Sequence, residues 1–260
     1  GITVRRIQQM CKKGEISGAS KEGCAWLIPE DAIFPCPSEK KKPLPIGIFD
    51  FQVATTNYYY VDKTLLIRDF LDTKPMVSLF TRPPQFGKTL NMDMLRVFFE
   101  KTCDDTSVYF RDKKIWKCGA SYTKQQGQYP VVFLTFKDVK CLTWEEIFQK
   151  IRRLISLEFI RHSELETSPL LNSYEKEQYH RLAGNDANEV DCQMALQILT
   201  ILLHKHYEKE CIIIIDEYDT PIQQGHSCNF YPEIVNFMCN FFLEGLRIIP
   251  ILPLAFFLEF

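Results

Sequence analysis

The feature that most constrains the fold is a run of four isoleucines, Ile212–Ile215, followed by Asp216 and Glu217. Successive side chains of a β-strand point to opposite faces of its sheet, so this strand must be buried on both faces. Sheets of that kind are mostly parallel and carry helices on each face. The two carboxylates would then stand at the carboxyl end of a central strand, where open α/β sheets bind ligands.

Further strand and helix signals alternate along the same part of the chain. Apolar runs indicate strands, and amphipathic stretches between them indicate helices. The strands are expected at 76–81, 131–136 and 211–215, and the helices at 63–72, 90–101, 144–162 and 191–208. This alternation predicts an α/β fold in which a mostly parallel sheet lies between two helical layers, a three-layer sandwich.

The joint between the first strand and its helix contains Phe86-Gly87-Lys88-Thr89. In a phosphate loop, glycine lets the backbone approach the phosphates and the helix amides point at them. The lysine adds positive charge, and the threonine hydroxyl binds Mg²⁺. The full motif, GxxxxGK[ST], has a glycine where this chain has Arg82. The tripeptide alone therefore fits a helix start with a solvated lysine as well.

The second motif decides between these interpretations. Asp216 would hold Mg²⁺, and Glu217 would orient and deprotonate an attacking water, although acids at an ordinary strand exit are simply solvated. Both motifs follow strands and stand in the usual order, which predicts a P-loop NTPase domain that binds ATP and Mg²⁺. The nucleotide-binding residues are then Arg82, Phe86, Gly87, Lys88, Thr89 and Asp216, with Thr89 and Asp216 on the metal and Glu217 catalytic.

Five blocks of this region resemble the AAA-ATPase-like family of bacteria, a divergent P-loop group. They are residues 59–64, 80–83, 86–92, 134–138 and 215–222, within a resemblance that covers about Leu44 to Arg247. The family loop commonly reads Arg-Pro-Arg-Arg-Phe-Gly-Lys, so an arginine in place of the first glycine is a family trait. Here Pro84 and Gln85 replace the two middle basic residues. The pattern indicates a helix cap for Asp62 and no role for Lys63.

The resemblance also implies features beyond the two motifs. Family members typically continue into a sensor strand and a helical lid, and often into a nuclease-like domain of the PD-(D/E)XK type. The sequence after Arg247 differs from that pattern and offers no Thr or Asn as a sensor. We therefore expect a P-loop domain that is incomplete at its C-terminus and hydrolyses ATP weakly at most. The alternative is a non-enzymatic DNA-binding or scaffold protein with a degenerate or truncated P-loop domain; a small-molecule kinase would need an acceptor site, which the sequence does not show.

A linker at 34–45, with four prolines and three consecutive lysines, separates a segment at 1–33 from the P-loop region at 46–260. Prolines at this density interrupt helices and central strands. In the short segment, apolar spacing predicts a helix that starts at Thr3 and ends before Gly14. A hairpin follows over 16–28, with its turn at Glu22-Gly23.

This segment resembles the small winged helix-turn-helix modules of excisionase and MerR type. The helix places Arg5, Gln8, Gln9 and Lys12 on one broad polar side, which could contact bases and phosphates of duplex DNA. The opposite side, with Ile7, Met10 and Cys11, would pack on Trp26 and Ile28 of the hairpin. A solvated basic helix, or one that docks on an unknown protein partner, explains the pattern equally well.

Composition limits the remaining classes of protein. A formal net charge of -2 argues against a surface built wholly for nucleic acid. The ten cysteines include no CxxC pair, so we expect reduced, small apolar residues and no zinc site. The chain opens without a secretory signal and has no apolar run of the ~20 residues that cross a membrane, which predicts a cytoplasmic protein without a membrane partner.

Replacing Arg5 and Lys12 together with alanine should weaken binding to duplex DNA. Each phosphate contact releases counterions, so the slope of log affinity against log salt should fall by about two. Fluorescence anisotropy with random duplex DNA at low salt measures this, and ATP affinity should stay unchanged. If the unmodified chain binds no DNA at low salt, protein docking becomes the better account of the segment.

Overall fold

The computed structural model describes residues 4–23, 25–32, 42–73, 77–79, 87–184, 186–246 and 254–257. The chain forms two compact units, residues 1–44 and 45–260. Each unit has its own apolar core, and each is described by itself below.

In its described residues, the small unit has one helix and one hairpin. Helix α1 (Val4–Lys12) precedes strands β1 (Ser20–Glu22) and β2 (Ala25–Leu27), which pair antiparallel. Met10 and Cys11 are buried against Ile16, and the partly buried neighbours of this cluster include Ile7, Trp26 and Ile28. The predicted hairpin and the predicted apolar side of the helix are therefore confirmed. Thr3, the expected helix cap, lies outside the described residues.

The large unit alternates helices with the strands of a sheet. Its helices are α2 (Phe51–Asn57), α3 (Leu65–Thr73), α4 (Lys88–Phe99), α5 (Ala120–Thr123), α6 (Trp144–Arg161), α7 (Ser173–Ala183), α8 (Glu189–Tyr207), α9 (Asp219–Cys228) and α10 (Tyr231–Leu246), with short 3₁₀ helices η1 (Thr106–Tyr109), η2 (Lys114–Cys118) and η3 (Ser163–Leu165). Its strands are β3 (Val77–Leu79), β4 (Val131–Thr135), β5 (Ile212–Asp216) and β6 (Leu254–Phe257). Among the described residues, every helix falls short of the length and apolar character needed to cross a membrane.

The four strands stand in the order β3-β6-β5-β4, and each described pair is parallel. The prediction of a mixed α/β unit with a parallel sheet is confirmed. Strand β6 comes from the apolar tail that sequence analysis did not assign to the sheet. It lies between β3 and β5 and pairs with both of them.

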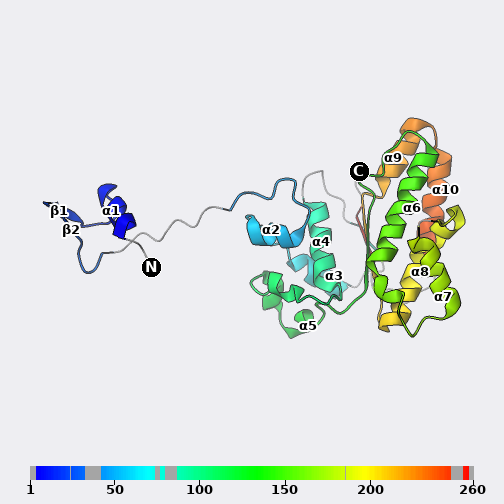
Figure 1. Cartoon of the computed structure of the whole chain (residues 1–260), viewed down its shortest axis with the longest axis horizontal. Helices are drawn as coiled ribbons and strands as arrows, with labels where there is room; N and C mark the ends of the chain where they lie inside the picture. Colours follow the sequence, from blue (N-terminus) through cyan, green and yellow to red (C-terminus); the bar gives the residue numbers. More distant parts are fainter. Residues whose placement is uncertain are drawn as a thin grey trace. The chain divides into compact units, whose positions relative to one another are not determined.

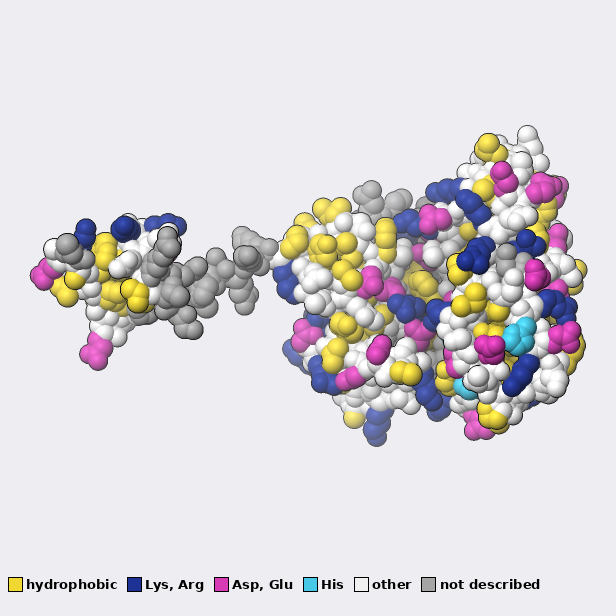
Figure 2. Space-filling view, in the orientation of Figure 1, with side chains coloured by type: hydrophobic (Ala, Val, Ile, Leu, Met, Phe, Trp, Pro, Cys, Tyr) yellow, Lys and Arg dark blue, Asp and Glu magenta, His cyan; other side chains and the backbone are white. Residues whose placement is uncertain are grey.

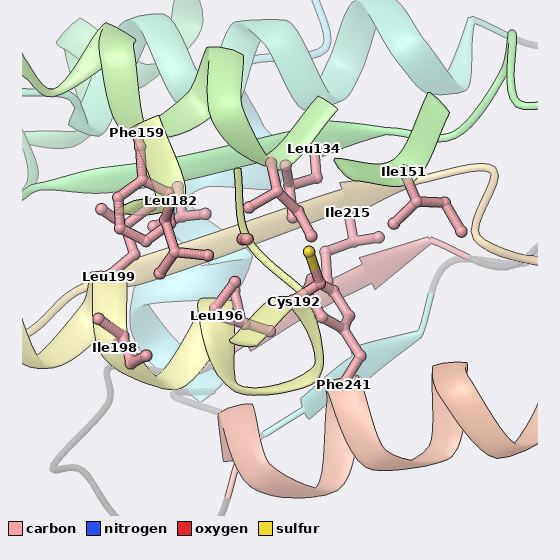
Figure 3. Packing of buried hydrophobic residues seen from close by; sticks show 14 of the residues in the cluster. Leu134, Ile151, Phe159, Leu182, Cys192, Leu196, Ile198, Leu199, Ile215 and Phe241 are labelled. Carbon is pink, nitrogen blue, oxygen red and sulfur yellow. The ribbon is translucent and has the colours of Figure 1, made fainter. Parts of the chain in front are cut away.

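Strand β5 is buried along its whole length, as the isoleucine run predicted. Ile212 and Ile214 belong to the core on one face of the sheet, together with residues of α4. Ile213 and Ile215 belong to the core on the other face, together with residues of α6, α8 and α10. Figure 1 shows α2, α3 and α4 on one side of the sheet and α6, α8 and α10 on the other. Figure 3 shows Ile215 among side chains from the second layer.

The outer edge of β4 is closed by side chains at the end of α6. The backbone N–H of Phe133 donates to Glu158 Oε1 at 2.7 Å. The carbonyl oxygen of Val131 accepts from Arg161 Nη2 at 2.5 Å and lies 3.1 Å from His162 Nε2. An edge strand with open N–H and C=O groups is a template for unwanted pairing. Here α6 supplies the partners that a fifth strand would have supplied.

The same charges connect the two helical layers. Arg161 donates to Glu158 on α6 and also to Glu100, which follows α4. Arg96 on α4 donates to Glu100 Oε2 at 2.9 Å and to Asp93 Oδ1 at 2.6 Å. These carboxylates are nearly buried, so each needs its arginine partner to offset the loss of water.

In this network, burial and hydrogen bonding act in opposite directions on the pKa values of Glu158 and His162. Burial alone would raise the pKa of the Glu158 carboxyl, but hydrogen bonds from Arg161 and His162 outweigh burial and lower this pKa to about 2. Burial alone would lower the pKa of His162, but hydrogen bonds to Glu158 and Glu164 outweigh it and raise this pKa. The stability that Glu158 contributes is therefore lost as pH falls toward about 2, and the contribution of His162 is lost as pH rises through its raised pKa.

Glu158→Gln should lower the free energy of unfolding at pH 7 by about 3 kcal/mol, because it removes one of the two buried carboxylates that pair with Arg161. The gap to the unmodified chain should shrink between about pH 5 and pH 2, where Glu158 itself becomes protonated. Urea denaturation at several pH values measures both effects. The control is Glu177→Gln, which removes a mostly exposed carboxylate 3.9 Å from Arg181 and should cost less than about 1 kcal/mol. A gap that stays constant with pH would contradict the expectation.

Candidate functional site

Gly87 is the N-cap residue of helix α4 and has φ 75° and ψ 33°. This left-handed conformation strains any residue with a Cβ, and glycine adopts it freely. Lys88 and Thr89 form the first turn, which the hydrogen bond from Asn91 N to Gly87 O closes at 3.0 Å. The backbone N–H groups of a first turn have no partner within the helix, and together with the helix dipole they attract anions.

The two sequence motifs meet at this helix start. The Thr89 hydroxyl donates to Asp216 Oδ2 at 3.0 Å. Asp216 is the last residue of β5 and is only 2% exposed. The contact forms because α4 packs on the face of β5 that carries Ile212 and Ile214. A hydroxyl and a carboxylate, distant in the sequence, are thus placed within one hydrogen bond of each other.

A second hydroxyl group, that of Thr135, donates to the same carboxylate. Thr135, the last residue of β4, stands opposite Asp216 in the parallel register. Its hydroxyl donates to Asp216 Oδ2 at 3.4 Å, a longer and weaker contact than that of Thr89. The sequence pattern indicates no role for Thr135, although it is the polar residue that ends the apolar run of β4. Its position could be inferred only with the knowledge that β4 is the neighbour of β5.

Glu217 follows Asp216 in a left-handed conformation, with φ 52°. The chain turns there from β5 into α9, and Thr220 N donates to Glu217 O at 3.1 Å. This conformation costs a residue other than glycine about 1–2 kcal/mol. Strain of this kind is concentrated at functional sites, where the position of a side chain matters more than local stability. The turn leaves the Glu217 side chain half-buried at the end of the sheet.

The structure brings some of the predicted residues together and leaves others apart. Thr89 and Asp216 are in contact, Gly87 and Lys88 are the neighbours of Thr89 in the chain, and Glu217 is the neighbour of Asp216. Arg82 and Phe86 lie outside the described residues. The predicted DNA-contacting residues belong to the small unit, where Gln8, Gln9 and Lys12 are exposed on α1 and only the backbone of Arg5 is described.

The oxygen donors suit Mg²⁺ that arrives with phosphate. Magnesium in proteins is usually held by one or two carboxylates together with substrate phosphates and water. Asp216 offers one carboxylate and Thr89 one hydroxyl. In the described part of the chain, no group of three or more His, Cys, Asp and Glu side chains is arranged to hold a metal by itself. These two oxygen ligands therefore fit a Mg²⁺ ion that is also bound by nucleotide phosphates better than a metal ion held by protein ligands alone.

A family model described as "Predicted AAA-ATPase" matches residues 45–257. The chain belongs to the AAA-ATPase-like family. This match starts where the sequence resemblance was expected to start, but it continues past Arg247 and includes β6. The expectation that the family pattern ends at Arg247 is therefore wrong. No curated protein and no solved structure matches the chain.

Proposed function

We propose that the large unit is an ATP-binding module with a P-loop fold. The observation that carries this proposal is the contact between Thr89 and Asp216, which joins the start of α4 to the end of β5. Membership of the AAA-ATPase-like family supports nucleotide binding. The parallel sheet with helices on both faces supports the P-loop architecture, because ligands of such sheets bind at the carboxyl ends of the strands.

Each residue of the proposed site has a distinct role. The backbone N–H groups at Gly87, Lys88 and Thr89 would donate to phosphate oxygens, and the Lys88 ammonium would offset phosphate charge. Thr89 and Asp216 would hold Mg²⁺, and Arg82 and Phe86 would complete the loop around the nucleotide. A bound Mg²⁺ would supply neutralisation of the charge on the β- and γ-phosphates.

Hydrolysis would depend on Glu217. Its carboxylate would orient a water molecule and accept a proton as the water oxygen bonds to the γ-phosphorus and the bond to the β-phosphate oxygen breaks. The sequence of β6, the strand that pairs with β5, contains no Thr or Asn that could act as a sensor. We therefore propose an ATPase that is weak at most. The alternative is a degenerate domain that binds DNA or a protein and hydrolyses no ATP.

We propose that the small unit is a DNA-binding head, made of a helix and a wing-like hairpin as in the winged helix-turn-helix modules that its sequence resembles. The supporting observation is that Gln8, Gln9 and Lys12 are exposed on α1 while Met10 and Cys11 on its other side are buried. The visible face of the large unit shows basic and acidic side chains interspersed (Figure 2), which suits DNA less well. The anisotropy titration with Arg5→Ala and Lys12→Ala tests this second function.

Lys88→Ala should weaken Mg·ATP binding by at least ~1.5 kcal/mol, or roughly tenfold, because a charge-assisted hydrogen bond to phosphate is lost. Isothermal titration calorimetry measures the affinity. The control is Lys124→Met, which removes an exposed lysine beyond α5 and should leave the affinity unchanged. A folded, unmodified chain that binds no ATP, or equal affinities for the unmodified chain and Lys88→Ala, would contradict the proposal.

The unmodified chain should turn over ATP well below the ~1–100 s⁻¹ of competent phosphoryl-transfer enzymes. Glu217→Gln should abolish the remaining rate while ATP still binds, since the amide cannot accept the proton. A coupled phosphate-release assay measures the rate, and calorimetry measures binding in the same preparation. Brisk turnover by the unmodified chain, lost in Glu217→Gln, would show that this site needs no polar sensor on β6.

A further inference from the structure

A second lysine lies at the start of α4. A Cβ placed on Gly87 would be 3.5 Å from Lys63 Nζ, so the Lys63 ammonium stands next to the N-cap residue of the helix. Lys63 comes from the segment before α3 and is distant in sequence from Lys88. The first turn of α4 thus has two lysines close to it, Lys88 within the turn and Lys63 from outside it.

The residues that flank Lys63 are fixed by a network around Asp62. Asp62 Oδ1 accepts from Thr64 N at 2.9 Å and from Thr64 Oγ1 at 2.7 Å. The other carboxylate oxygen accepts from Lys114 N at 2.8 Å, at the start of η2. Thr64 is fully buried, and its hydroxyl oxygen accepts from Ile115 N at 3.1 Å. Asp62 therefore bonds to the residue that precedes α3 and ties the segment around Lys63 to η2.

Tyr60 ties the same segment to α4. Its hydroxyl oxygen accepts from Lys63 N at 3.4 Å and lies at the same distance from Met94 Sδ, to which it donates. Its ring packs edge-on against Phe51, with the ring centroids 5.3 Å apart. The backbone of Lys63 is held between α4 and η2, so its side chain starts from a fixed point.

The proposed site has an excess of negative charge that the Lys63 ammonium could offset. The triphosphate of ATP carries several negative charges, and Asp216 and Glu217 add two more nearby. Between Arg82 and Lys88 the chain has no charged side chain. Charge-assisted bonds from ammonium groups to phosphate are among the strong polar contacts of proteins. A cation brought from outside the loop would offset the charge that the loop itself leaves unbalanced.

We propose that Lys63 is a phosphate-binding residue of the nucleotide site, acting beside Lys88. This inference rests on the proposed function of the large unit and adds a residue to it. Asp62, Thr64 and Tyr60 are positioning residues, since they act only through Lys63. The segment Tyr59–Thr64, for which the sequence indicated a cap and no chemistry, then has a functional role.

The test compares four variants by calorimetric titration with Mg·ATP and, separately, with Mg·tripolyphosphate. Lys63→Met and Lys63→Gln both remove the charge, and the second keeps a polar side chain in case the first does not fold. Lys63→Arg keeps the charge, and Lys124→Met is the matched control. Circular dichroism and thermal melting show which variants are folded. The neutral variants should lose about tenfold in affinity for both ligands, Lys63→Arg should retain most of it, and Lys124→Met should be unchanged.

The parallel loss for tripolyphosphate is the readout that contact with the base or sugar would not produce, and retained affinity in Lys63→Arg is the readout that a purely structural role would not produce. Neutral Lys63 variants that bind as the unmodified chain does, while Lys88→Ala is weakened, would overturn the role of Lys63 and leave the proposed function intact. An equal loss in Lys63→Arg and Lys63→Met would also overturn it, since charge would then not matter. No ATP binding by the folded, unmodified chain would overturn the proposed function and this inference together.

Discussion

The large unit depends on the complete burial of β5. A strand with no exposed residue needs a helical layer on each face and a strand on each edge, and this chain supplies all four. Strands β4 and β6 occupy the edges, α4 lies on one face, and α6, α8 and α10 lie on the other. The same burial holds Asp216 at the end of the strand, where a carboxylate is kept in place by hydroxyl donors. The proposed nucleotide site is thus continuous with the buried core around β5.

Strand β4 covers one edge of β5, and its own outer edge then carries backbone N–H and C=O groups that need hydrogen-bond partners. Apolar side chains cannot satisfy the backbone groups of Val131 and Phe133, so charged residues of α6 do it. A charge used this way must itself be paired, and the pairing extends through Arg161 to Glu100 and Arg96. The side chains that bond to the edge of β4 therefore belong to an ion network that joins both helical layers. The network lies at the amino end of β4, while the proposed nucleotide site lies at the carboxyl ends of the strands.

Sequence patterns predicted those parts of the structure whose signal is local. The isoleucine run gave β5, and the apolar spacing of 144–162 and 191–208 gave α6 and α8 to within a few residues. Helix α9 was not predicted because Pro221 and Gly225 interrupt its helical apolar spacing. Helix α10 was not predicted because it is apolar on most sides. Strand β6 follows two prolines in a tail that has no polar alternation. The contacts of Thr135 and Lys63 depend on which strands and segments become neighbours, which is set by the tertiary fold and leaves no mark in local spacing.

The left-handed conformation of Glu217 determines which substitutions at this position would stabilise the fold. Glycine or asparagine would relieve the strain there, and neither could replace a carboxylate as a proton acceptor. In the proposed role, folding and chemistry thus favour different residues at one position. Stability–activity trade-offs of this kind mean that inactivating substitutions can make a protein more robust. Copies of this domain released from the need to hydrolyse ATP would drift toward small or amide side chains at this turn, and they would be the more heat-resistant ones.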